Sequence, residues 1–99
     1  MMSTTQGPWS EAGLQLQSLR LHREITAGEM AEQVNAPSRQ WILDIETGRR
    51  AVPSSMYNSL ASIFDIPVRD FAAMCLRYYD HQAYEALFGD QKDMVAVAA

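Results

Sequence analysis

The stretch from Thr26 to Gly48, TAGEMAEQVNAPSRQWILDIETG, constrains the fold most, because its caps and breaks divide it into two short helices. Thr26 is placed to cap the first helix, and Asn35-Ala36-Pro37 stops it. Ser38 is placed to cap the second helix, and Gly48 supplies a left-handed residue at its end. The sequence therefore predicts a helix pair with a tight connection between its members.

The second helix is expected to bury one face and to expose the other. At about 100° per residue, Ile42, Ile45 and Glu46 share the face that points toward the core. The outward positions are Gln40, Asp44 and Thr47, with Trp41 and Leu43 on the two flanks. A compact helix pair that shows a polar face to solvent is the arrangement that lets a helix enter a DNA major groove.

Length and composition allow one domain with tails. The chain has 99 residues, of which 47% are hydrophobic and 20% charged, as is ordinary for a soluble globular protein. The N-terminus has neither the basic region nor the apolar run of a secretory signal, and the apolar end DMVAVAA is shorter than the ~20 residues of a membrane span. We expect a soluble, cytoplasmic protein without a membrane segment.

The net charge of −4 argues mildly against promiscuous binding of nucleic acid. The acidity is unevenly distributed, however. Residues 19–53 carry five arginines and five acidic residues, whereas residues 54–99 carry three basic and six acidic residues. A DNA-binding surface near the helix pair would therefore make few phosphate contacts, and its salt dependence would be modest.

The rest of the chain is expected to be helical, without strands or repeats. We expect a disordered lead-in over residues 1–10, from which Trp9 can pack back onto the domain. A helical domain over 11–67, one long helix over 68–88 and a flexible tail over 89–99 are expected to follow. The first helix of the domain covers residues 11–23, and its fourth begins at Ser54 or Ser55. The fold class is all-α, with five helices and an extended C-terminal helix.

The apolar stripe of the last helix exceeds what so small a domain can cover. A second copy of the chain is a natural cover for it. The residues expected at this dimer interface are Phe71, Cys75, Tyr78, Tyr79 and Leu87. Leu14 and Leu21 are expected in the core or in a dimer seam.

Enzymatic chemistry is not indicated. No grouping of nucleophile, base and orienting acid is recognisable, and there is no glycine-rich phosphate loop. His22 and His81 are isolated, and a single cysteine cannot form an internal disulfide. We expect no enzyme activity, no metal site and no cofactor.

Short motifs between Leu19 and Phe71 carry a family resemblance through their joint spacing. They are Leu19-Arg20, Arg23, Ile25-Thr26, Glu29-Met30-Ala31-Glu32, Ser38-Arg39, Ile42, Ile45-Glu46, Gly48-Arg49, Pro53, Leu60-Ala61, Ile66-Pro67-Val68 and Phe71. This span resembles the phage repressor and Cro type of helix-turn-helix domain, also called xenobiotic-response-element-like. The resemblance implies a five-helix lambda-repressor-like fold, binding of double-stranded DNA as a homodimer, and transcriptional control.

The resemblance also implies roles for individual residues. Positions that read bases fall on Arg39, Gln40 and Asp44, with Trp41 beside them. Arginine suits guanine O6 and N7, glutamine suits adenine N6 and N7, and aspartate could accept from cytosine N4. Positions that contact the DNA backbone fall on Thr26, Ser38, Thr47, Arg49 and Arg50. A buried ion pair between Arg20 and Glu46 is expected to fix the angle of the reading helix.

Two alternatives stay open beside a homodimeric repressor that reads a palindromic operator. In the first, the same domain is an antitoxin, whose C-terminal helix and tail neutralise a toxin. In the second, the fold is a protein-interaction module that has lost DNA binding, which the acidic charge and the large apolar Trp41 and Leu43 favour. Both alternatives require a protein partner.

Overall fold

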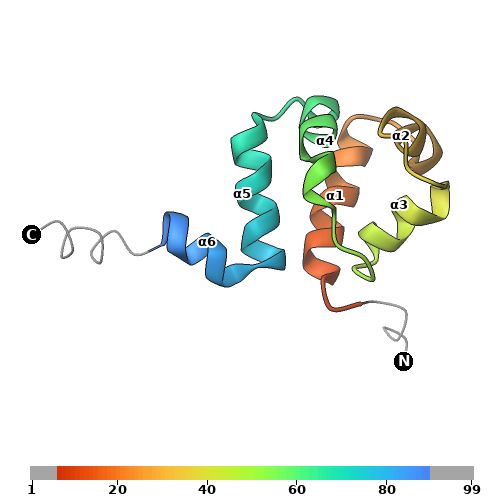
Figure 1. Cartoon of the computed structure of the whole chain (residues 1–99). Coiled ribbons are helices and arrows are strands. Elements are labelled where there is room, and N and C mark those ends of the chain that lie inside the picture. The colour runs from red at the N-terminus through yellow and green to blue at the C-terminus, as the bar shows by residue number, and fades with distance from the viewer. Residues whose placement is uncertain (1–6, 90–99) are drawn as a thin grey trace, which may run out of the picture.

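The computed structural model describes residues 7–89 and shows an entirely helical chain over that range (Figure 1). The elements are α1 (Ser10–His22), α2 (Ala27–Gln33), α3 (Arg39–Glu46), the short 3-10 helix η2 (Ser54–Met56), α4 (Tyr57–Phe64), α5 (Val68–Tyr79) and α6 (His81–Phe88). The all-α expectation is confirmed for these residues. None of these helices is both long enough and apolar enough to cross a membrane.

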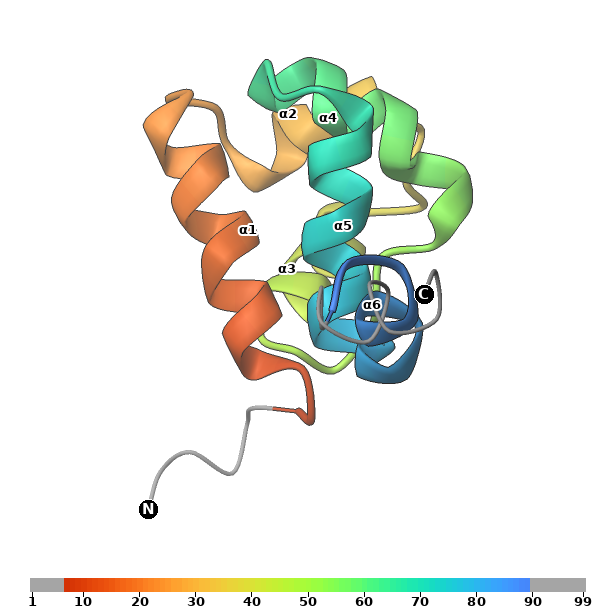
Figure 2. The same cartoon turned by 90° about the vertical axis from the view of Figure 1, so that its left-hand side faces the viewer.

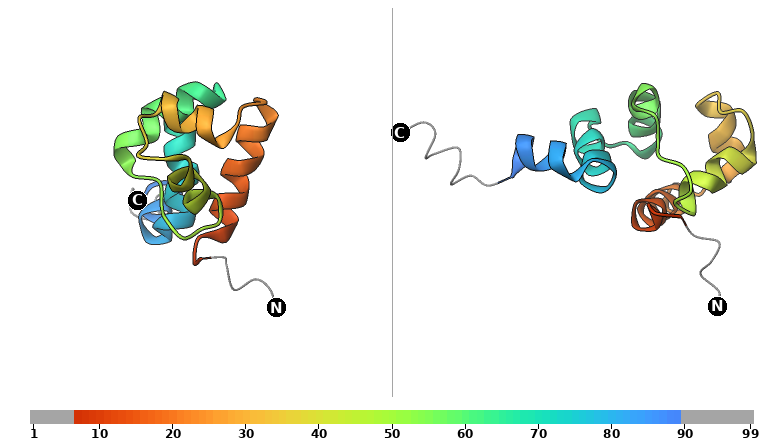
Figure 3. Two further views of the ribbon diagram at one scale, coloured as in Figure 1. Left: turned by 90° about the vertical axis from the view of Figure 1, so that its right-hand side faces the viewer. Right: turned by 60° about the horizontal axis from the view of Figure 1, so that its bottom comes forward.

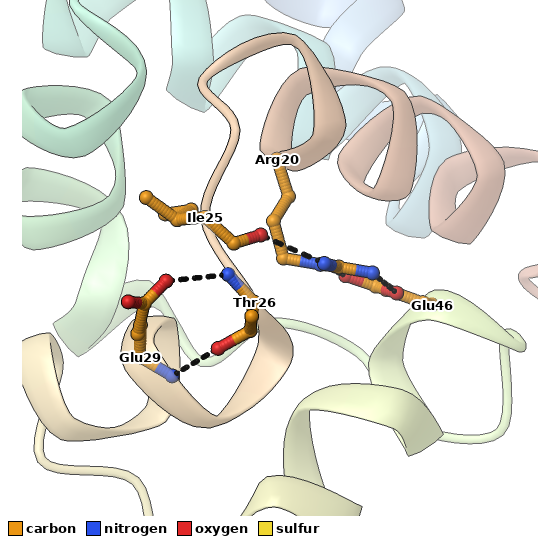
Figure 4. Close-up of polar contacts among 5 residues, drawn as sticks. All are labelled: Arg20, Ile25, Thr26, Glu29 and Glu46. Carbon is orange, nitrogen blue, oxygen red and sulfur yellow. Dashed lines mark hydrogen bonds and ion pairs between the residues drawn. The ribbon is translucent and has the colours of Figure 1, made fainter.

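The helix boundaries follow from local capping chemistry. Thr26 accepts a hydrogen bond from the Glu29 amide at 3.0 Å, and the Glu29 carboxylate accepts one from the Thr26 amide at 2.8 Å, which completes a capping box (Figure 4). Ser38 accepts a hydrogen bond from the Trp41 amide at 3.2 Å and so opens α3. Gly48 has the positive φ of 84° that was expected of it at the end of α3.

The core lies where α1, α3, α4 and α5 meet, with α2 closing it beside α3 (Figure 2). Its least exposed large side chains are Leu16, Met30, Ile42, Ile45, Leu60, Phe71 and Cys75. Phe71 contacts the rings of Tyr57 and Phe64 at centroid distances of 5.8 and 5.9 Å. Helices α2 and α3 are too short to be stable alone, so the packing of their apolar faces on the core stabilises them as helices.

The single helix expected over 68–88 is wrong. Asp80 breaks it, with φ −145° and ψ 76°, and its carboxylate accepts a hydrogen bond from the Ala83 amide at 3.1 Å. Asp80 is thus the N-cap of a separate helix, α6, because an aspartate that bonds an amide three residues on competes with helix continuation. The described chain has six α-helices rather than five, and α6 projects from the body in contact with α5 (Figure 1).

The disordered lead-in expected over residues 1–10 is wrong for residues 7–10, and residues 1–6 lie outside the described part. The Gly7 amide donates to the Thr47 carbonyl, the Trp9 ring packs against Tyr79, and Ser10 is already the first residue of α1. The tail beyond Gly89 also lies outside the described residues.

The structure corrects the expected dimer interface at two of its five positions. Phe71 and Cys75 are each 1% exposed, because α5 turns them into the chain's own core. Tyr78 and Tyr79 are partly buried, and Leu87 on α6 is 61% exposed. Leu14 and Leu21 are also exposed, so neither is a core residue. The apolar surface available to a partner therefore lies on α6 and on the outer face of α1.

The buried thiol of Cys75 and the partly buried phenols of Tyr57 and Tyr79 make the stability of the fold fall at alkaline pH. Burial raises the pKa of Cys75 from 9.0 to about 12, and those of Tyr57 and Tyr79 from 10.0 to about 12. As the pH rises, the unfolded chain loses these protons first, so the free energy of unfolding falls between pH 9 and pH 12. Urea unfolding at about pH 8 and about pH 10.5 measures the fall. We expect a smaller fall in the double variant Cys75→Ala/Tyr79→Phe, and equal stability of the wild type at both pH values would contradict the prediction.

Candidate nucleic-acid interface

Helix α3 lies at one side of the molecule, opposite α6 (Figures 1 and 3). Its inner face is covered by α1 and α2, and Ile42, Ile45 and Glu46 on that face are buried as expected. Gly13 on α1 allows the close approach, since a Cβ there would lie 2.6 Å from the Ile45 carbonyl oxygen. The backbone of α3 is thereby held tightly against α1, while its first turn remains at the surface.

The structure brings Arg20 of α1 and Glu46 of α3 together. The Arg20 Nε donates to Glu46 Oε2 at 2.6 Å, and the second guanidinium nitrogen, Nη2, donates to Oε1 at 3.0 Å (Figure 4). Arg20 Nη1 also donates to the Ile25 carbonyl at 2.9 Å. Hydrogen bonding to Glu46 raises the pKa of Arg20, so the guanidinium stays charged. This two-pronged contact fixes the C-terminal end of α3 relative to α1 and to the start of α2.

The side chains expected to read bases share the outer side of α3. Arg39 and Gln40 in its first turn are exposed, and Asp44 is partly buried one turn later. The Gln40 Nε2 donates to Asp44 Oδ1 at 3.1 Å. This bond uses one N–H of the Gln40 amide and leaves its oxygen and its other N–H without a role in the contact.

The guanidinium group of Arg50 lies over the ring of Trp41. The guanidinium carbon of Arg50 lies 5.2 Å from the centroid of the Trp41 ring, which is a cation–π distance. Trp41 and Leu43 are both partly buried and pack against the core. Much of the apolar surface that favoured a protein-interaction module is therefore used within the chain.

The hydroxyl groups expected at the DNA backbone differ in whether their proton is already used in a hydrogen bond. The hydroxyls of Thr26 and Ser38 accept amide hydrogen bonds, so each retains its own proton for donation to a phosphate. The Thr47 hydroxyl instead donates to the Asp44 carbonyl at 3.2 Å, so its proton is already used. Arg49 and Arg50 are exposed in the loop after α3, and their amides both donate to the Asp44 carbonyl.

Two further residues position α3: Gly13, which the sequence reasoning missed, and Trp9, whose contact with Tyr79 it did not identify. Gly13 stands in a helical stretch where glycine is unfavourable, and such a glycine signals close packing. Trp9 is a large aromatic residue in an otherwise polar lead-in. Both signals are visible in the sequence, but neither says which element is contacted.

The side chains that could ligate a metal are dispersed in the described part of the chain. Over residues 7–89, no three histidine, cysteine, aspartate or glutamate side chains are grouped so that they could hold a metal ion. Cys75 is buried, and its raised pKa keeps the thiol protonated at neutral pH.

The fold and the surface of α3 define a class of protein. Two short capped helices, α2 and α3, pack against each other, and the second presents a polar first turn at the surface, which is the helix-turn-helix arrangement. A family model described as a helix-turn-helix domain matches residues 11–74, about two thirds of the chain, and the protein belongs to this family. Comparison with curated proteins gave no match, and comparison with solved structures gave none either.

Proposed function

We propose that the protein is a sequence-specific DNA-binding transcriptional regulator, a homodimeric repressor that reads a palindromic operator through α3. It acts by occupancy, as a binding protein rather than an enzyme. The observation that carries the proposal is the exposed first turn of α3, where Arg39 and Gln40 face solvent while the opposite face is fixed by the core and the Arg20–Glu46 pair. Membership of the helix-turn-helix family supports DNA as the partner.

The division of labour within the interface follows from side-chain chemistry. Arg39 and Gln40 would contact base edges in the major groove, with Asp44 holding Gln40 in position. Thr26, Ser38, Arg49 and Arg50 would contact phosphates and so set the register of the helix on the duplex. Trp41 would keep Arg50 close to α3 through their ring contact.

The second subunit is proposed to pack on α6. Within the described chain α6 has no buried residue, and Leu87 and Phe88 are 61% and 43% exposed. A self-complementary contact between two such helices would generate the two-fold axis that a palindromic operator requires. The same apolar face also favours an antitoxin as the alternative function, because a toxin could cover α6 in place of a second copy.

A gel shift on the DNA upstream of the protein's own gene tests the proposal. We expect binding at low salt, with log K falling against log salt with a slope of about −4, because a dimer would present two copies each of Arg49 and Arg50. Arg49→Ala should weaken binding to all sequences and reduce the slope, whereas Arg69→Ala on α5 is the matched control. Absence of a shift at about 50 mM salt would count against the proposed operator site. A neighbour-encoded protein that copurifies with the chain and requires α6 would favour the antitoxin.

A further inference from the structure

The segment Gly7–Ser10 lies outside the helix-turn-helix arrangement, yet its amides donate hydrogen bonds to the backbone just after α3. The Gly7 amide donates to the Thr47 carbonyl at 2.9 Å, and the Trp9 amide donates to the Gly48 carbonyl at 3.1 Å. Carbonyls at the C-terminal end of a helix lack donors within the helix itself. Figure 1 shows this red segment beside the loop that follows α3.

Two glycines allow the segment to touch that loop backbone to backbone. A Cβ on Gly7 would lie 2.6 Å from the Cα of Arg49, and a Cβ on Gly48 would lie 2.5 Å from the Cα of Ser10. Distances this short exclude a side chain at either position. The segment and the loop therefore pack directly against each other through their backbones.

Trp9 fixes the segment to the rest of the molecule. Its ring meets that of Tyr79 edge to face, at 5.7 Å between centroids and 87° between planes. Its carbonyl accepts a hydrogen bond from the Gly13 amide at 2.9 Å, within the first turn of α1. Trp9 thus links the end of α3 to α1 and to the last residue of α5.

We propose that Gly7–Ser10 is a positioning strap, with Trp9 as its anchor, that sets the place of residues 47–50 relative to α1 and α5. Residues 47–50 include Arg49 and Arg50, the proposed phosphate contacts. The strap's effect on DNA affinity therefore rests on the proposed function, whereas its effect on the loop does not. Trp9 is a positioning residue and needs no contact with DNA itself.

Two variants in the full chain break the strap in different ways. Trp9→Ala removes the anchor, and Gly7→Ala keeps the anchor but collides with the backbone of Gly48 and Arg49. Trp9→Phe, which retains a ring to meet Tyr79, and Asn58→Ala, at an exposed position of α4, are the controls. Native-state amide exchange is measured at Arg49 and Arg50, whose amides bond the Asp44 carbonyl, and at Val34, which reports on α2.

We expect exchange at Arg49 and Arg50 to accelerate about tenfold or more in both strap variants, while Val34 changes less than about twofold. A role in overall stability alone would accelerate all three amides by the same factor. That result, or unchanged exchange at Arg49 and Arg50 in both strap variants, would overturn the proposal.

DNA binding provides the second readout. In the strap variants we expect Kd to rise about tenfold or more and the salt slope to decrease in magnitude, with the preferred base sequence unchanged, because phosphate contacts set register and carry no base information. A wild-type chain that binds no DNA would refute the proposed function, while the exchange result still decides the strap. Faster exchange at the loop with an unchanged Kd would overturn its role in positioning the phosphate contacts.

Discussion

Replacing Glu46 by alanine is expected to lower the free energy of unfolding by about 3–5 kcal/mol, because it leaves the charged Arg20 guanidinium buried without its carboxylate. Arg20 is 8% exposed and Glu46 4%, so solvent cannot replace the lost partner without rearrangement of α1 and α3. Hydrogen bonding to Glu46 raises the pKa of Arg20, and arginine does not escape the penalty by losing its proton. Urea unfolding at neutral pH measures the change.

A double variant separates the stranded charge from the lost packing. Arg20→Met together with Glu46→Leu replaces both partners by apolar side chains of similar size, and we expect it to recover most of the stability lost in Glu46→Ala. It should nevertheless hold α3 less specifically, since the bond from Arg20 Nη1 to the Ile25 carbonyl also disappears. A loss below about 1 kcal/mol in Glu46→Ala would show that the pair is not buried as described.

Replacing Phe71 by alanine is expected to reduce stability by about 3–5 kcal/mol, because the variant leaves a cavity where the rings of Tyr57 and Phe64 now meet it. Phe88→Ala is the matched control, since the same atoms are removed from a side chain that is 43% exposed. We expect that variant to change monomer stability by less than about 0.5 kcal/mol and to weaken self-association instead.

The Phe71→Ala and Phe88→Ala variants are each measured at a low and a high protein concentration. Unfolding is followed where the chain is monomeric, because association adds to apparent stability, and the dimer constant is determined by analytical ultracentrifugation. If Phe71→Ala weakened the dimer with little effect on the monomer, the assignment of Phe71 to the core would be wrong. If Phe88→Ala left association unchanged, α6 would not be the dimer face.

The helix pair was predictable because its signals are local. Thr26, Ser38 and Gly48 act on amides and carbonyls within a few residues of themselves, and the structure places each cap where the sequence predicted it. The inward face of α3 followed from the helical period alone. No tertiary information was needed for either result.

The predictions that failed depended on which residues contact each other in the folded chain. Apolar residues recur at helical spacing on both sides of Asp80, so periodicity alone predicted one helix where the structure has α5 and α6. Aspartate is nevertheless a favoured N-cap residue, and Asp80 caps α6 by accepting a hydrogen bond from the amide three residues on. Phe71 and Cys75 lie on the same stripe as residues that remain accessible, and the packing of α4 and α1 against α5 separates them. The sequence of residues 1–10 likewise did not identify Tyr79 as the residue that Trp9 would meet.

Selection of binding sites from a random pool of duplex DNA tests the central claim, that the exposed turn of α3 reads bases, most directly. The wild-type chain should enrich two half-sites centred about 10 base pairs apart. Arg39→Ala and Gln40→Ala should each lose preference at one position of the half-site, at about 1–3 kcal/mol per half-site, and keep the remainder. Recovery of the same sequence by the Arg39→Ala/Gln40→Ala double variant, or failure of the wild-type chain to enrich any sequence, would contradict the claim.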